Sequence, residues 1–314
     1  MSALRLGTRK SLMATTQSQL VADALSQRTG HAVELVGVTT EGDVSKAHLA
    51  QIGGTGVFVN GIRERLLSGE IDFAVHSLKD LPTAPPEGIA LAATPTRDDP
   101  RDALCSAPLV TPHHPRGGPV KLADLPRGAR VGTGSPRRVA QLRAVRPDLD
   151  VVPIRGNADT RLRKVTDGEL AAVVLAYAGL VRIERLDDVA EVLDPAVMLP
   201  APGQGALAVE CRADRADLVE LLGTIDDPAT RAAVTAERAV LAALEAGCSA
   251  PVGAYATEDF QKLHLTAAVV SYDGARQVRL SAIGQPARAE ELGRELAAQL
   301  LADGADQLMG EQAP

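Results

Sequence analysis

Cationic and hydroxyl side chains follow the ends of several expected strands. Short apolar runs that indicate strands are "LRLGT", "IDFAVHS", "ARVGTG", "DVVPIRG" and "AAVVLAYAG". The polar groups at or just after their ends are Thr8, Arg9, Lys10 and Ser11; His76, Ser77, Lys79 and Asp80; Thr133, Ser135, Arg137 and Arg138; Arg155, Asn157 and Arg161; and Tyr177 and Arg182. Any one arginine is compatible with a solvated helix face. Five clusters at strand ends favour a shared binding site instead.

These groups point to an anionic ligand. Arginine binds carboxylates or phosphates through two parallel hydrogen bonds, and helix N-termini add oriented N–H donors. The stretch "VGTGSPRRVAQLRAVR" predicts such a terminus, with Pro136 in the first helical turn. We expect Arg137 and Arg138 to face the ligand there; alternatively, one of these neighbours points to solvent. Neither G-x-x-x-x-G-K-[ST] nor G-x-G-x-x-G occurs, so distributed carboxylates are favoured over a nucleotide.

One acidic residue stands among these cations. Asp80, in "VHSLKDLP", could form an exposed ion pair with Lys79, which would contribute little stability. The alternative is a carboxylate kept ionised by the surrounding cations. Such a group would stabilise positive charge that develops on a bound substrate.

The three cysteines differ in their surroundings. Cys105 and Cys211 lie in apolar, strand-like runs and are expected to be structural. Cys248, in "LEAGCSAPVG", follows a helix and is either a small buried thiol or a covalent attachment point. An odd count without C-x-x-C indicates neither a disulfide framework nor a zinc site. The pair His113–His114 has no Cys, Asp or Glu close by, so no metal site is predicted.

Composition excludes several classes of protein. The 314 residues carry a net charge of -7 and only 2% aromatic residues, which disfavours binding of nucleic acid through phosphates or base stacking. No apolar run is long enough to span a membrane, and the N-terminus has no apolar signal core, so we expect a cytoplasmic protein.

Strands and helices alternate twice along the chain. Helices are predicted at "SLMATTQSQLVADALSQRTG", "VFVNGIRERLLSGE", "PRRVAQLRAVR" and "ADTRLRKVTDGE". Further strands are expected at "VELVGVTT", "IALAAT" and "ALAVEC". The last ninety residues read as α+β, with a long helix from about Asp227 to Glu245. The fold class is therefore α/β: two doubly wound domains with mainly parallel sheets and a smaller α+β domain.

Taken together, the motifs resemble one family, porphobilinogen deaminase, also called hydroxymethylbilane synthase. The similar stretches occur in family order over essentially the whole chain. They are "LGTRKS", "EGD", "GGTGVFV", "DFAVHSLKDLPT", "RDDPRDAL", "VGTGSPRRVAQL", "IRGNADTRL", "LAYAGLVRI", "LPAPGQGALAVEC", "TAERAVLAALEAGCSAPVGAYA" and "GADQL". Among these, "AVHSLKDLP", "GSPRR" and "GC.AP.G" are specific in combination.

The resemblance implies an activity and a cofactor. The implied enzyme is a transferase of porphyrin and heme biosynthesis that deaminates four porphobilinogen molecules. It joins them head to tail into the linear tetrapyrrole hydroxymethylbilane. It implies a dipyrromethane cofactor tied by a thioether to Cys248, with Asp80 as the catalytic residue and no metal. The implied cofactor- and substrate-binding positions are Arg9, Ser11, Ser77, Lys79, Thr133, Ser135, Arg137, Arg138, Arg155, Arg161, Arg182 and Gln204.

Three domains are implied as well, the first two similar to type II periplasmic binding proteins. We place them at 1–96 with 202–223, at 101–199 and at 226–314, the last one carrying Cys248. The glycine-rich segment 40–56 is a candidate lid, although Glu41 and Thr55 replace residues that are often basic. We expect a monomer whose partner is the small molecule porphobilinogen.

Two alternatives belong to other classes. A non-catalytic polycarboxylate-binding protein would share both α/β lobes and the arginines, but would not need Cys248 or the last ninety residues. A nucleic-acid-binding regulator would need a basic helix-turn-helix segment, and none precedes the first strand.

The implied substrate accounts for the abundant arginine in an acidic chain, because each added porphobilinogen ring brings an acetate and a propionate.

Overall fold

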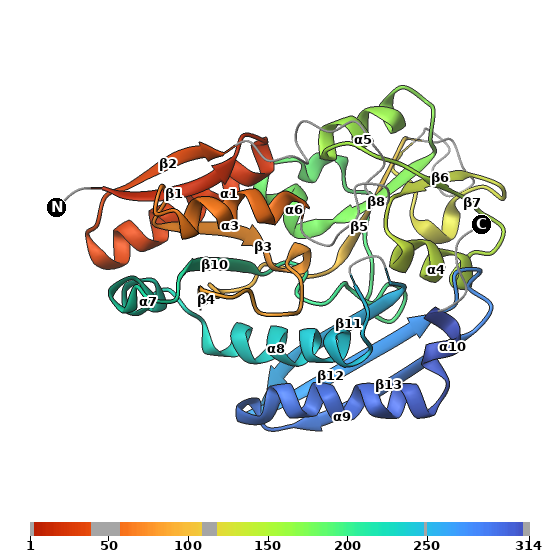
Figure 1. Cartoon of the computed structure of the whole chain (residues 1–314). Helices are drawn as coiled ribbons and strands as arrows, with labels where there is room; N and C mark the ends of the chain where they lie inside the picture. The colour runs from red at the N-terminus through yellow and green to blue at the C-terminus, as the bar shows by residue number, and fades with distance from the viewer. Residues whose placement is uncertain (1–2, 39–56, 109–117, 248–249, 310–314) are drawn as a thin grey trace.

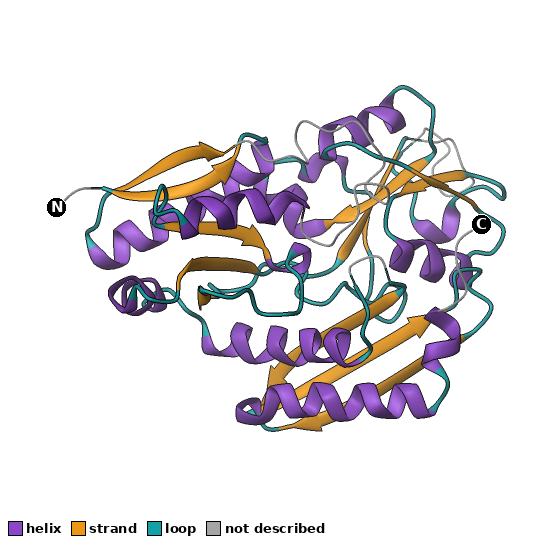
Figure 2. Cartoon of the chain, viewed as in Figure 1, coloured by secondary structure: helices purple, strands orange, loops and turns teal. Residues whose placement is uncertain are grey.

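The chain folds into two α/β lobes and a third, α+β domain (Figures 1 and 2). The computed structural model describes residues 3–38, 57–108, 118–247 and 250–309. The candidate lid 40–56, the pair His113–His114 and Cys248 therefore lie outside the described residues. No helix among the described residues is long and apolar enough to cross a membrane.

Lobe 1 is built on a five-stranded sheet with strand order β2-β1-β3-β10-β4. Its strands are β1 (Leu4–Arg9), β2 (Val33–Val38), β3 (Phe73–Ser77), β4 (Ile89–Ala93) and β10 (Leu207–Arg212). Its helices are α1 (Leu12–Thr29), α3 (Val57–Leu67) and α7 (Ala216–Gly223). The helix α1 begins after Ser11, whose side chain accepts from the N–H of Ala14, and ends at Gly30, whose φ of 73° suits glycine.

Lobe 2 repeats this plan, with strand order β7-β6-β8-β5-β9. Its strands are β5 (Asp102–Ser106), β6 (Arg130–Thr133), β7 (Asp150–Pro153), β8 (Ala172–Ala176) and β9 (Glu191–Val192). Its helices are α4 (Pro136–Val145), α5 (Ala158–Thr166) and α6 (Tyr177–Arg182). Short 3-10 helices are η1 (Leu78–Asp80), η2 (Leu122–Asp124), η3 (Leu186–Asp188) and, in the third domain, η4 (Pro286–Arg288).

Each five-stranded sheet contains one strand that runs against the other four. In lobe 1 this strand is β10, antiparallel to β3 and β4, and in lobe 2 it is β5, antiparallel to β8 and β9. Both follow segments that cross between the lobes, from β4 to β5 and from β9 to β10. The prediction of two mainly parallel α/β sheets is therefore confirmed, and the two crossing segments are what join the lobes.

The third domain packs helices on one face of an antiparallel sheet. Strands β11 (Val252–Asp259), β12 (Lys262–Val270) and β13 (Gln277–Gly284) pair in sequence order. Helices α8 (Pro228–Ala243), α9 (Ala289–Ala302) and α10 (Ala305–Met309) share a hydrophobic core with them. Figure 1 shows α8 between this sheet and lobe 1. The predicted α+β fold of this region, with its long helix, is confirmed.

One strand prediction was too long. The run "AAVVLAYAG" was predicted as one strand, but β8 ends at Ala176 and Tyr177 begins α6. The N–H of Tyr177 still donates to the carbonyl oxygen of Arg101, at 3.0 Å, in register with the β5–β8 ladder, but Tyr177 is already the first residue of the helix. Apolar periodicity alone could not separate the end of a buried strand from the start of a short buried helix.

Candidate active site

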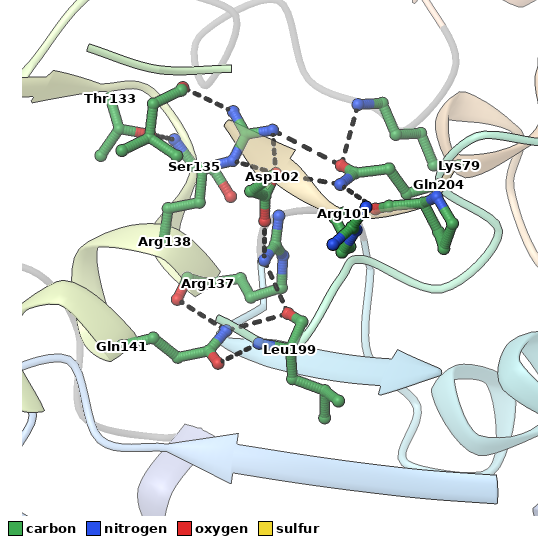
Figure 3. Close-up of polar contacts among 12 residues, drawn as sticks. Lys79, Arg101, Asp102, Thr133, Ser135, Arg137, Arg138, Gln141, Leu199 and Gln204 are labelled. Carbon is green, nitrogen blue, oxygen red and sulfur yellow. Dashed lines mark hydrogen bonds and ion pairs between the residues drawn. The ribbon is translucent and has the colours of Figure 1, made fainter. Parts of the chain in front are cut away.

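A buried carboxylate holds the two adjacent arginines of α4 (Figure 3). Asp102, the first residue of β5, is 0% exposed, and Arg137 and Arg138 are 3% and 5% exposed. Arg137 Nη1 lies 2.7 Å from Asp102 Oδ2, and Arg138 Nη2 lies 2.7 Å from Oδ1. Arg138 Nε donates to Oδ1 as well, at 3.0 Å. Neither arginine points to solvent, because each binds one oxygen of the same carboxylate.

Main-chain carbonyl oxygens accept further hydrogen bonds from Arg137 and Arg138. Arg137 Nη1 also donates to the carbonyl oxygen of Leu199 at 2.7 Å, and Arg138 Nη1 donates to that of Val174 at 3.0 Å. Arg137 Nε is buried without a hydrogen-bond partner among the described residues. A guanidinium has five N–H donors, so Arg137 keeps donors for a further acceptor while Arg138 is nearly saturated.

Gln204 links this cluster to lobe 1. Its Nε2 donates to Asp102 Oδ1 at 2.9 Å and to the carbonyl oxygen of Pro100 at 2.7 Å. Its Oε1 accepts from Lys79 Nζ at 3.2 Å and from Arg138 Nη2 at 3.4 Å (Figure 3). Lys79 follows β3 of lobe 1, and Arg138 belongs to α4 of lobe 2. Lys79 and Arg138, which are far apart in the sequence, therefore donate to the same amide oxygen.

We call the place where the lobes meet at Lys79, Asp102, Arg137, Arg138 and Gln204 the junction. It has an excess of positive charge. Burial, followed by the repulsion of Arg138, lowers the pKa of Lys79 to about 8. Burial, followed by Arg138, also lowers the pKa of Arg161. The pKa of Asp102 is lowered well below its usual range, because the attraction of Arg137 and Arg138 outweighs its burial. An added anion would relieve this excess, since buried charge is stabilised by opposite charge nearby.

Asp80 lacks the protein partners that hold the other acid of the site, Asp102. Asp80 ends the 3-10 helix η1 and is exposed. It has no hydrogen-bond or ion-pair partner among the described residues, so the ion pair with Lys79 considered from the sequence is absent there. Its charge nevertheless acts on the neighbouring Lys79, whose pKa it raises against the larger effect of burial.

The other cationic positions fall into two groups. Arg155 is exposed and makes no hydrogen bond or ion pair within the described part of the chain, and Arg161 Nε donates to the carbonyl oxygen of Gly156 at 2.8 Å. Arg182 of α6 instead binds Asp98 and the carbonyl oxygen of Gly205, at 2.7 and 2.6 Å. Arg182 thus joins lobe 2 to both crossing segments.

The predicted hydroxyl positions have local partners. Ser11 caps α1, and Ser77 Oγ lies 3.0 Å from Nε2 of Gln17 in that helix. Thr133 is buried and its hydroxyl accepts from the N–H of Ser135 at 3.2 Å. Ser135 is the N-cap residue of α4 and its side chain makes no capping bond, which leaves this hydroxyl available. Arg9, the last residue of β1, is half-buried.

The two described cysteines are structural, as expected. Burial raises the pKa of Cys105 to about 12 and that of Cys211 to about 11, so neither thiol is a nucleophile near neutral pH. Both lie in sheet cores and are free thiols. Among the described residues no group of three His, Cys, Asp or Glu side chains could hold a metal ion.

Three important groups of the structure were not predicted from the sequence. Asp102 lies in "RDDPRDAL", and an aspartate at the start of an apolar strand is a signal of a paired buried charge. Glu237 and Arg238 lie in α8, whose alanine-rich periodicity drew attention to packing alone. Glu237 is fully buried and binds Arg97 with both oxygens, at 2.6 and 3.0 Å.

The fold and the junction define a class: a two-lobed α/β protein with a cation-rich site where the lobes meet. Solved structures with a similar fold include the methionine-binding protein MetQ, at TM-score 0.42 and 14% identity over 71% of this chain and 89% of that one. The VFT2 domain of Bordetella pertussis BvgS has TM-score 0.42 and 18% identity over 71% of this chain and 86% of that one.

The chain belongs to the porphobilinogen deaminase family. The family description "Porphobilinogen deaminase, dipyromethane cofactor binding domain" matches residues 4–220, and "Porphobilinogen deaminase, C-terminal domain" matches residues 231–302. A porphobilinogen deaminase of Thermobifida fusca is 59% identical, covering 98% of this chain and 96% of that protein. Porphobilinogen deaminase 1 of Streptomyces coelicolor is 57% identical, covering 99% and 98%. A Mycobacterium tuberculosis relative is 53% identical, covering 98% of each chain.

Family membership confirms the activity and the cofactor expected from the sequence. The chain is a transferase that deaminates porphobilinogen and joins four molecules into hydroxymethylbilane on a dipyrromethane primer. The residues present fit such a group. Among the residues that the structure describes, Arg137 keeps a buried donor without a partner, cations outnumber carboxylates at the junction, and no cation forms an ion pair with Asp80.

Proposed function

We propose that Asp80 is the catalytic carboxylate and that the cations of both lobes bind the acetates and propionates of the cofactor and the growing chain. The support for this proposal is a contrast at the junction: Asp80 is exposed and has no hydrogen-bond or ion-pair partner in the described part of the chain, and it lies next to buried cations. Loss of ammonia from porphobilinogen leaves positive charge on the substrate. A fixed carboxylate stabilises that charge most where no protein cation already neutralises it.

The binding residues would act in two ways. Arg137, Lys79 and Arg161 are partly or fully buried and add charge around the ligand's carboxylates. Arg155 and Ser135 keep side chains available and would add directed hydrogen bonds. Arg9, Ser11, Ser77, Thr133, Arg138, Arg182 and Gln204 complete the proposed set, and several of them act by fixing neighbours.

Cys248 is the proposed anchor of the dipyrromethane cofactor through a thioether. Its support is elimination among thiols: Cys105 and Cys211 are buried in sheets and have raised pKa values. When bound, the cofactor supplies the acceptor ring to which the first porphobilinogen is joined. The domain boundaries given above, a monomeric state and a cytoplasmic location remain predictions from the sequence.

Native mass spectrometry after limited addition of porphobilinogen tests the binding roles. Wild type should show a ladder of enzyme–substrate adducts. We expect Arg137→Leu and Arg155→Leu to stall at an early rung, because a charge-assisted hydrogen bond is worth about 1.5–3 kcal/mol, or roughly one to two decades in affinity. Arg163→Leu, an exposed residue of α5 outside the proposed set, is the matched control. An unchanged ladder in both test variants would refute the assignment.

A further inference from the structure

Helix α8 of the third domain is hydrogen-bonded to the turn 78–82, which carries Asp80. Arg238, on α8, donates from Nη1 to the carbonyl oxygens of Leu78 and Leu81, at 3.3 and 3.0 Å. Its Nη2 donates to the carbonyl oxygen of Pro82 at 2.6 Å. These carbonyls flank Asp80 on both sides along the chain. One guanidinium therefore fixes the backbone around the acid without contacting its carboxylate.

Apolar packing holds the same turn from the same helix. Val234 lies one helical turn before Arg238 and shares a buried cluster with Leu78 and Leu81. On the side of lobe 1, the N–H of Leu78 donates to the carbonyl oxygen of Ala206 at 3.0 Å. Arg238 is half-buried, and this burial lowers the pKa of its guanidinium. The turn has little freedom while α8 is in place.

We propose that Arg238 is a positioning residue for catalysis: it sets the Asp80 carboxylate through three carbonyl bonds from the third domain. The same helix ends at Ala243, five residues before Cys248. One rigid element would thus set the acid and lead into the anchor segment, so the third domain takes part in catalysis as well as in cofactor attachment. This inference rests on the proposed catalytic role of Asp80.

The competing explanation is simple docking of α8 on lobe 1. Arg231 provides a matched control, because it lies two turns earlier on the same helix and also donates to lobe 1 carbonyls. Its Nη2 lies 3.1 Å from the oxygen of Ala92, and its Nε lies 2.7 Å from Asp226. Loss of either arginine removes a docking contact, but only Arg238 contacts the turn of Asp80.

The test compares Arg238→Met, Arg238→Lys and Arg231→Met as cofactor-loaded enzymes, with the loading checked by intact mass. We expect Arg238→Met to lower kcat by about 10- to 100-fold with little change in KM, the scale of a small misplacement of a catalytic group. Arg238→Lys should recover part of kcat, since an ammonium can still donate to these carbonyls. Arg231→Met should keep kcat within about twofold of wild type, since it leaves that group in place.

A double-mutant cycle with Asp80→Asn then separates the two ideas. If Arg238 acts through Asp80, adding Arg238→Met to Asp80→Asn should change kcat little further, because coupled residues are not additive. Additive losses, or equal kcat in Arg238→Met and Arg231→Met, would overturn the positioning role. Should Arg238→Met fail to load cofactor, the same cycle is run with Arg238→Lys. Full activity of Asp80→Asn alone would instead refute the proposed function itself.

Discussion

The acid and the arginines of this site are held in opposite ways. Asp80 is exposed and has no side-chain partner among the described residues, while the backbone around it is fixed by Arg238. Arg137 and Arg138 are buried, and their side chains are fixed by Asp102. The Asp80 carboxylate, which is proposed to stabilise positive charge that forms during the reaction, is thus not neutralised by an ion pair among the described residues. Arg137 and Arg138, which are proposed to bind the carboxylates of the ligand, are held in place before the ligand binds. This reduces the loss of side-chain freedom on binding.

Removing the charge of Asp80 should give the largest effect on turnover. Asp80→Asn keeps the size of the side chain and leaves the backbone contacts in place. We expect kcat to fall at least ~100-fold, the scale of losing one preorganised electrostatic group. Steady-state kinetics on enzyme with a verified cofactor mass measures it. The thermal midpoint should stay near wild type, since Asp80 has no hydrogen-bond or ion-pair partner among the described residues. Near-normal turnover would contradict the catalytic role.

Removing the charge of Asp102 should show the reverse pattern, with stability lost first. Asp102→Asn leaves two buried guanidinium groups without their carboxylate, and breaking a buried pair costs about 3–5 kcal/mol. We expect a lower thermal midpoint and weaker retention of the cofactor. If Asp102 only neutralised charge, its removal would instead tighten binding of carboxylates, and a lowered KM at unchanged stability would decide for that view.

The pH dependence of Asp102 follows from its lowered pKa. A carboxyl whose folded pKa lies below its unfolded value of about 3.9 adds stability that is present above that value. The stability is lost as the pH falls through the folded pKa. Acid unfolding of wild type should therefore be steeper below about pH 4 than that of Asp102→Asn. Parallel acid-unfolding curves would show that Asp102 is not paired as described.

A smaller effect is expected at Lys79, whose pKa is lowered to about 8. The unfolded chain keeps this proton up to about pH 10.4, so the folded state gains relative stability as pH rises between the two values. Ligand carboxylates favour the charged form, so kcat/KM should fall by about tenfold above pH 8. Lys79→Arg should remove this alkaline fall, because arginine stays charged. An identical pH profile in Lys79→Arg would assign the fall to another group.

Much of the fold followed from local patterns. Strand and helix order, the separate last ninety residues and the helix beginning after Ser135 could be predicted, because apolar periodicity and the Ser-Pro start of α4 are local signals. The end of β8 at Ala176 could not, since a buried strand and a short buried helix have the same apolar sequence.

The site was only partly predictable for a different reason. Lys79 and Arg138 were recognised separately as strand-end cations, but their meeting at Gln204 depends on two crossing segments and on pairings between distant parts of the chain. The sequence alone does not give Asp102 or Arg238 a binding or catalytic role. Their importance comes from what they hold, and that becomes visible only when the partners are in place.

Intact-protein mass spectrometry tests whether the cofactor is attached at Cys248. We expect the purified chain to carry a covalent adduct of two pyrrole units, Cys105→Ala and Cys211→Ala to keep it, and Cys248→Ala to lose it. The buried, high-pKa thiols of the first two explain why they cannot substitute. An adduct that persists in Cys248→Ala would refute Cys248 as the anchor, and a wild-type chain without an adduct after incubation with porphobilinogen would refute the covalent cofactor.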